Sequence, residues 1–180
     1  GHVLDREDPD AAAIVQDELQ RDGVQLVLDA RLQQVNRSEA GRTLLVQRNG
    51  SSESFEVDEI LVGAGRFPDV QGLNLEGVGV RFDERKGVEV NDHLQTANPN
   101  IYAAGDVCME WKFTHAADFA ALIVIQNALF SVAGLGRKRL SSLTMPWCTY
   151  TDPEIAHVGL YPLEAEKRGL AIDTWTQPFA

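Results

Sequence analysis

The chain has 180 residues and a mass of 19.8 kDa, and its composition is 44% hydrophobic and 24% charged. This composition is typical of a globular protein and excludes the disordered and fibrous classes. Sixteen Lys and Arg residues against 27 Asp and Glu residues give a formal net charge of -11. A chain this acidic repels phosphate backbones and anionic lipid heads, so its charge disfavours nucleic-acid and membrane partners.

The first predicted elements are a helix and a strand. Asp8 is a suitable cap and Pro9 a suitable first helical residue. Apolar residues then recur at four-residue spacing, and Gly23 is well placed to end the helix. The short apolar run 24–28 has the length of a strand, and a helix followed at once by a strand is typical of an α/β fold.

The next segment alternates in the manner of strands rather than helices. Residues 31–37, 43–48 and 53–57 are predicted strands, separated by turn residues at 38–41 and at 49–52. Three short strands joined by tight turns indicate an antiparallel meander.

The middle of the chain combines short apolar strands with one long helix. Residues 59–62, 87–90 and 101–104 are predicted strands, the first of them leading into small residues. A helix is predicted from Thr114 to about residue 130. Because its inner part is apolar on all sides, we expect it to be buried.

The last part of the chain begins after a basic break at 137–139, which is predicted to be a solvated linker or domain edge rather than an anion site. Strands are predicted at 144–150, 155–160 and 171–176, with a short helix at 162–168. The two cysteines, Cys108 and Cys148, are far apart, which favours a reduced cytoplasmic setting with both thiols acting as small apolar residues.

Residues 101–106 place a carboxylate where ligands often bind. A strand that ends in small residues followed by Asp106 brings that side chain to the carboxyl edge of a sheet. There it can accept hydrogen bonds from sugar or ribityl hydroxyls, or it can simply cap the next turn, and the spacing leaves both open. The helix from Thr114 adds free N–H groups and the positive end of a dipole. This order is typical of a pocket for a polyol linked to an electron-accepting ring, and also of a βα unit without a ligand.

Several segments, in chain order, resemble the flavin-dependent pyridine nucleotide-disulfide oxidoreductases. Residues 62–69 (VGAGRFPD) resemble the GxGRxPN stretch of that family, and residues 96–107 (TANPNIYAAGDV) resemble its TxxPxIYAxGD flavin motif. Residues 146–160 resemble the opening of its dimerisation domain, and residues 6–10 the late part of its nicotinamide-nucleotide domain. The stretch 113–119 is closer to the mercuric-reductase-like members.

The resemblance implies a fold and a domain organisation. It implies an α/β chain with partial FAD- and NAD(P)-binding Rossmann-like domains, an antiparallel meander, and the start of an α+β dimerisation domain. Residues 1–65 would be the C-terminal part of the NAD(P)-binding domain, and residues 66–139 the second part of the FAD-binding domain. Residues 140–180 would begin the dimerisation domain of a cytoplasmic homodimer.

The resemblance also implies roles for individual residues, with FAD and NAD(P) as cofactors. Asp106 would bind the ribityl hydroxyls of FAD, with Gly105 allowing a close approach to the backbone. Thr114 would offer its backbone to the flavin ring at the helix start, and Gly65 would lie near the nicotinamide nucleotide. The same resemblance gives Arg66 and Pro68 a part in shaping the domain crossover. His115 would either tune the flavin edge or be an ordinary helix-start histidine.

The chain also departs from the family pattern. The first GxGxxG and the redox-active cysteine pair are absent, and neither cysteine occupies the redox position. The second GxGxxG is expected before Gly1, and the catalytic His and Glu after Ala180, so no catalytic residue is assigned. We therefore expect an internal segment of a longer enzyme that is inactive when isolated.

Three functional hypotheses follow from the sequence. The first is a segment of an enzyme that passes electrons from nicotinamide through flavin to a disulfide, another small molecule or a metal ion. The second is a non-catalytic module that dimerises through residues 144 onward. The third is a metal site of Cys108, His115, Cys148 and His157, which the wide spacing disfavours because structural zinc ligands come in close pairs.

Overall fold

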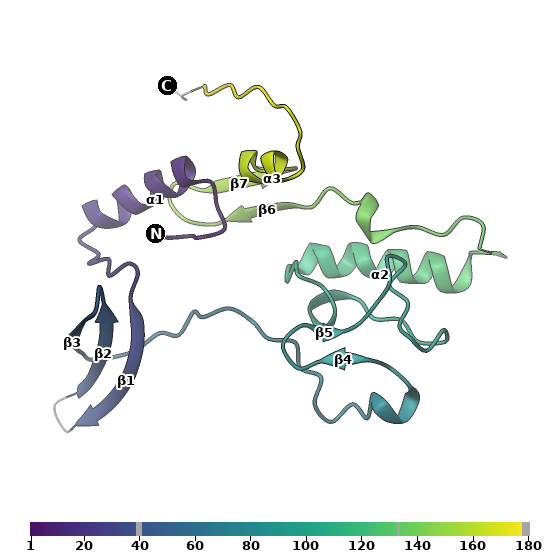
Figure 1. Cartoon of the computed structure of the whole chain (residues 1–180), viewed down its shortest axis with the longest axis horizontal. Coiled ribbons are helices and arrows are strands. Elements are labelled where there is room, and N and C mark those ends of the chain that lie inside the picture. Colours follow the sequence, from purple (N-terminus) through teal and green to yellow (C-terminus); the bar gives the residue numbers. More distant parts are fainter. Residues whose placement is uncertain (39–40, 133, 178–180) are drawn as a thin grey trace. The chain divides into compact units, whose positions relative to one another are not determined.

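The computed structural model describes residues 1–38, 41–132 and 134–177 (Figure 1). The chain divides into two compact units. The first, which we call the split unit, consists of residues 1–63 and 148–180, and the second, the central unit, of residues 64–147. The two domain boundaries that the resemblance implies, after residues 65 and 139, stay predictions.

Helix α1 (Pro9–Arg21) begins at the proline that the sequence indicates. Asp8 precedes it with extended backbone but makes no capping bond with its side chain. Gly23 follows the helix with φ +85°, a left-handed conformation that glycine adopts without strain. The predictions of where this helix starts and stops are therefore confirmed.

The antiparallel meander is also confirmed. Strands β1 (Arg31–Ser38), β2 (Gly41–Arg48) and β3 (Ser51–Val57) form one sheet in sequence order. Asn49 and Gly50 alone connect β2 to β3, and both have positive φ, as a tight type I′ hairpin turn requires. The other predicted turn, at 38–41, includes residues 39–40, which lie outside the described residues.

The C-terminal part of the split unit is held to the segment before α1 by a buried carboxylate. Strand β6 (Pro146–Thr149) pairs with β7 (Ile155–Val158), and helix α3 (Pro162–Lys167) follows. Thr149 Oγ1 donates to Glu7 Oε1 at 3.3 Å, and the Tyr161 hydroxyl donates to Glu7 Oε2. Glu7 is only 9% exposed. One acidic side chain thus binds residues that lie 142 and 154 positions away.

The central unit is built on helix α2 (Thr114–Leu129) and a hairpin of β4 (Phe82–Asp83) and β5 (Gly87–Val88) (Figure 1). A short 3-10 turn, Gly105–Val107, lies between them in the sequence. One buried cluster surrounds the helix: Leu94, Met109, Ala116, Ala120, Ile123 and Met145. A second surrounds the hairpin: Val70, Val80 and Val88. Val90 and Cys108 pack against both clusters and join them into one core.

Three predicted strands are wrong. Residues 24–28, 59–62 and 171–176 have irregular backbone, and the predicted strand 101–104 is reduced to a single bridge between Tyr102 and Gln95. A strand forms only where a second strand satisfies its N–H and C=O groups. The described part of the chain supplies no partner strand to residues 24–28, 59–62 or 171–176.

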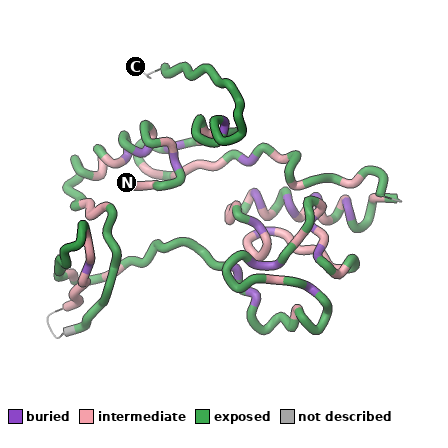
Figure 2. Tube along the Cα trace, viewed as in Figure 1, coloured by how far each residue is buried: buried purple, intermediate pink, exposed green. Residues whose placement is uncertain are grey.

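Helix α2 has the predicted length but not the predicted burial. Ala116, Ala120, Ile123 and Asn127 are buried, whereas Leu122 is 55% exposed and Leu129 73% exposed. Figure 2 shows buried and exposed stretches alternating along the helix. A helix that is apolar all round needs cover on every face, and the described residues cover one face. None of the described helices has the length and hydropathy needed to cross a membrane.

We predict that Gly87→Ala destabilises the central unit strongly. A Cβ at this position, where φ is +92°, would lie 2.0 Å from the carbonyl oxygen of Val107, so backbone must move to accept it. The matched control is Gly72→Ala, which also has positive φ (+73°) but meets nothing within 4 Å. Thermal unfolding should show the control losing about 1–2 kcal/mol for its backbone conformation and Gly87→Ala clearly more. Equal losses would contradict the crowding.

We predict that Tyr161→Phe destabilises the split unit by about 1–3 kcal/mol, because it leaves the buried Glu7 carboxylate without one donor. Burial, together with the bond to Glu7, raises the pKa of the Tyr161 phenol, which keeps it protonated as a donor. Tyr150→Phe is the control, since Tyr150 is 85% exposed. Urea unfolding of the two variants should differ, and indistinguishable midpoints would rule out a stabilising role for the Glu7 bond.

Candidate functional site

Asp106 lies in the 3-10 turn Gly105–Val107, which packs closely against helix α2. Gly105 has φ +80°, and a Cβ there would lie 3.0 Å from the Cβ of Ala117. Only glycine fits this position without strain, because it tolerates the positive φ and leaves room for the helix. The glycine therefore fixes where the turn presents the Asp106 side chain.

The Asp106 carboxylate forms an ion pair with Arg66. Arg66 Nη1 donates to Asp106 Oδ2 at 2.9 Å and also to the carbonyl oxygen of Lys112 at 3.3 Å. The Asp106 side chain is 42% exposed, so it remains accessible to a ligand. A carboxylate has about four acceptor positions, so one bond to Arg66 leaves acceptor capacity for hydroxyl groups.

A second cation binds the backbone of the same loop. Lys112 Nζ donates to the carbonyl oxygen of Asp106 at 3.1 Å and to that of Met109 at 2.9 Å. Asp106 and Lys112 are thus linked twice. Lys112 Nζ binds the Asp106 carbonyl oxygen directly, and Arg66 bridges the Asp106 carboxylate and the Lys112 carbonyl oxygen. The loop between the turn and helix α2 is held by two positively charged side chains.

Thr114 is the first residue of α2 and is exposed. The preceding residue, Phe113, is extended, with φ -116° and ψ 148°, and its carbonyl oxygen accepts from the Ala117 amide at 3.0 Å. The amides of the first helical turn have no acceptor within the helix, and the dipole places partial positive charge there. An anion or an electron-rich ring would be stabilised at this end.

His115 is held by its neighbours. Its Nε2 donates to the carbonyl oxygen of Pro146 at 2.7 Å, which places the ring proton on that nitrogen. Its ring stacks on Phe113, with centroids 5.4 Å apart, and Phe113 stacks in turn on Trp147. These contacts give the histidine a packing role, whether or not it also meets a ligand.

Gly65 lies in the exposed, irregular segment that precedes Arg66. Its φ is +89°, and nothing lies within 4 Å of the place where a Cβ would be. The structure therefore brings Gly105, Asp106 and the start of α2 together through the turn and its loop. Gly65 joins them only as the chain neighbour of Arg66.

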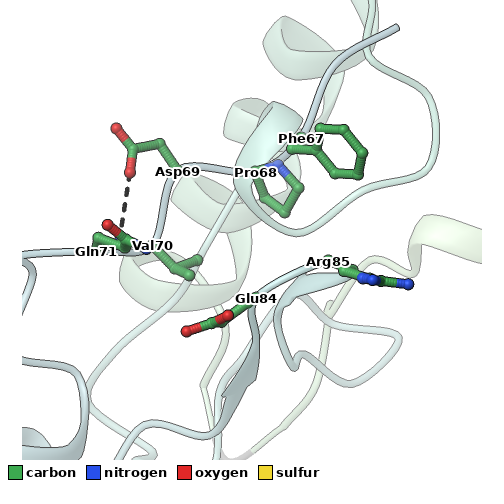
Figure 3. Close-up of a pocket in the computed structure, with 7 residues that line it drawn as sticks. All are labelled: Phe67, Pro68, Asp69, Val70, Gln71, Glu84 and Arg85. Carbon is green, nitrogen blue, oxygen red and sulfur yellow. Dashed lines mark hydrogen bonds between the residues drawn. The ribbon is translucent and has the colours of Figure 1, made fainter. Parts of the chain in front are cut away.

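The central unit also has an open hollow that other residues line. Figure 3 shows its lining, which comes from the segment after Arg66 and from the β4–β5 turn: Phe67, Pro68, Asp69, Val70, Gln71, Glu84 and Arg85. The Gln71 amide donates to Asp69 Oδ1 at 3.4 Å across one side of it. The predicted cofactor residues do not line this hollow.

The cysteines show no sign of a reactive or metal-binding pair. Both are free and partly buried, which is less burial than the sequence suggested. Burial raises the pKa of Cys108 to about 11, with Lys112 opposing the shift, and burial also raises the pKa of Cys148. Within residues 1–38, 41–132 and 134–177, no group of His, Cys, Asp or Glu is arranged to hold a metal ion.

Two contacts of the site escaped the sequence reasoning. Arg66 was expected to shape a domain crossover, and its pairing with Asp106 across 40 residues has no local signal. Lys112 belongs to none of the motifs, and its bonds go to carbonyl groups that every residue carries. The spacing of residues along the sequence therefore predicts neither contact.

Comparison with known proteins gives consistent matches. The family model described as "Pyridine nucleotide-disulphide oxidoreductase" matches residues 1–121. Mercuric reductase of Staphylococcus aureus is 33% identical over 171 residues, covering 95% of this chain and 30% of that protein. Dihydrolipoyl dehydrogenase of Thermus scotoductus is 33% identical over 180 residues, covering 99% and 38%. The chain spans about a third of the length of these curated relatives.

Solved structures agree with this result. LpdA from Mycobacterium tuberculosis superposes with a TM-score of 0.79 at 28% identity, covering 92% of this chain and 34% of that one. The flavoprotein disulfide reductase RclA from Escherichia coli gives 0.76 at 27% identity, covering 91% and 36%. The predicted α/β, Rossmann-like fold class is confirmed by these neighbours. The chain belongs to the pyridine nucleotide-disulfide oxidoreductase family.

Proposed function

We propose that the chain is a segment of an NAD(P)H-dependent, FAD-containing oxidoreductase of the mercuric reductase type. It would pass electrons from nicotinamide through flavin to a disulfide or a metal ion. The observation that carries this proposal is the turn at Asp106, whose accessible carboxylate lies in the flavin-motif segment and whose glycine packs on the start of α2. Relatives named mercuric reductase and dihydrolipoyl dehydrogenase match nearly the whole chain.

The residues present fit the flavin half of FAD. Asp106 offers acceptor oxygens to ribityl hydroxyls, and Gly105 lets the turn that carries it pack closely against helix α2. The first turn of α2, which begins at Thr114, would present to the ring its positive end and amides that lack an acceptor within the helix. When bound, the flavin supplies the two-electron chemistry, and the protein supplies its position and electrostatic surroundings.

The remaining assignments belong to the same proposal. Gly65 would lie against the nicotinamide nucleotide, where its open surroundings allow close approach. No residue of this chain is assigned a catalytic role. The net charge of -11 supports the expectation of no nucleic-acid or membrane partner, and the free cysteines support a cytoplasmic location. A homodimer formed through residues 140–180 completes the proposal.

The alternative function is a non-catalytic interaction module. It is favoured by the large apolar side chains exposed in the C-terminal part, which include Tyr150, Val158, Leu163 and Trp175. Apolar groups of this size gathered in one segment are typical of surfaces that bind another protein. Light scattering of the purified chain separates the hypotheses, because a monomer at high concentration would count against the module.

We predict that the purified 180-residue chain does not oxidise NADPH, even with added FAD. It carries neither of the glycine-rich phosphate-binding fingerprints on which dinucleotide binding depends. The assay follows NADPH absorbance, with a complete relative as the positive control. Sustained NADPH oxidation by the isolated chain would contradict the proposal that it is a segment of a longer enzyme.

We also predict that Cys108 reacts slowly with alkylating reagents, because its pKa of about 11 leaves little thiolate at neutral pH. Relative to an ordinary thiol, alkylation near neutral pH should be roughly a hundredfold slower. The measurement uses a Cys148→Ser variant, so that Cys108 is the remaining thiol, with the urea-unfolded variant as control. Equal rates in the folded and unfolded protein would contradict the suppression of the Cys108 thiolate by burial.

A further inference from the structure

The loop from Asp106 to Phe113 connects the two parts of the flavin site proposed above. Its first residue carries the carboxylate, and the residue after it begins helix α2. Any ligand that spans both parts requires a fixed separation between them. The contacts that hold this loop in place therefore set that separation.

Two cationic side chains bind the loop in a reciprocal arrangement. Arg66 reaches from outside the loop and joins the Asp106 carboxylate to the carbonyl oxygen of Lys112. The Lys112 ammonium group reaches back from the end of the loop to the carbonyl oxygens of Asp106 and Met109. Together these four hydrogen bonds tie the start of the loop to its end.

We propose that Arg66 and Lys112 are positioning residues for the flavin and form what we call the loop clamp. They hold the Asp106 carboxylate and the start of α2 at the separation that the ribityl chain and the ring require. The inference rests on the proposed function, since it takes the flavin as the ligand. Neither side chain is assigned any part in the chemistry.

The arrangement differs from an ordinary surface ion pair. The Arg81–Glu89 pair has the same 2.9 Å separation and similar exposure, at 75% and 54% against 67% and 42% for Arg66–Asp106. Arg81 and Glu89, however, lie only eight residues apart, and the bond of Arg81 goes to that one side chain. Arg66 instead bridges 40 and 46 residues and binds a side chain and a backbone group at once.

The clamp leaves the Asp106 carboxylate able to accept hydrogen bonds from a ligand. The bond from Arg66 engages Oδ2, and the bonds from Lys112 go to backbone carbonyls, so acceptor positions on Asp106 remain for hydroxyl groups.

The first experiment measures the clamp without flavin. Hydrogen exchange in the 180-residue chain is compared for Arg66→Met and Lys112→Met, with Arg81→Met as the matched control. The amides of residues 106–113 should exchange about two- to fivefold faster in the two clamp variants and should be unchanged in the control. Unchanged exchange in the clamp variants would overturn the clamp itself.

The second experiment measures flavin retention in the intact protein that carries this chain. FAD released on dilution is followed by its fluorescence for the same three variants. We expect FAD affinity about two- to fivefold weaker for Arg66→Met and Lys112→Met, and unchanged for Arg81→Met. Arg66→Met combined with Asp106→Asn should cost less than the sum of the two single changes.

The outcomes separate the two proposals. An intact protein that holds no flavin would overturn the proposed function, while the exchange experiment would still decide whether the clamp exists. Flavin that is retained equally by the wild type and by both clamp variants would overturn the positioning role and leave the proposed function standing.

Discussion

The central unit depends on one close approach, in which the turn Gly105–Val107 is packed between helix α2 and the β4–β5 hairpin. On one side Gly105 brings the turn against Ala117, and on the other Gly87 brings the hairpin against the Val107 carbonyl. The absence of a side chain at both glycines therefore sets how closely the turn, the hairpin and helix α2 can pack. Cys108, directly after the turn, packs on both hydrophobic clusters and so belongs to the same junction.

This junction explains why the candidate site is defined in a unit with so little regular structure. The β4–β5 pair has two residues in each strand, and the turn has three. Neither could hold a side chain in place alone, because short elements gain too little from their own hydrogen bonds. Helix α2 is the rigid element, and the close packing at Gly105 and Gly87 fixes the position of Asp106 relative to it.

The sequence predicts those features that depend on local chemistry. Pro9 and Gly23 mark the ends of α1, Asn49-Gly50 marks the hairpin of the meander, and the long apolar run gives α2 its length. It fails where a feature depends on a distant partner. Residues 59–62 have the composition of a strand but find no neighbour in the described chain, and one face of α2 stays uncovered for the same reason.

The candidate site follows the same division. Gly105 and Asp106 could be selected because they fall in the motif 96–107, and Thr114 because it begins the predicted helix. The partners that hold them could not, since Arg66 is 40 residues away and Lys112 acts through backbone groups.

The bonds of Glu7 have a consequence for the order in which the chain can assemble. Its partners Thr149 and Tyr161 lie beyond the whole of the central unit, which is thus inserted within the sequence of the split unit. During synthesis, residues 64–147 leave the ribosome before either partner of Glu7 does. The central unit can therefore form from contacts within one continuous stretch of chain. The split unit must close a far longer loop, and its two halves can meet only after the whole central unit has emerged.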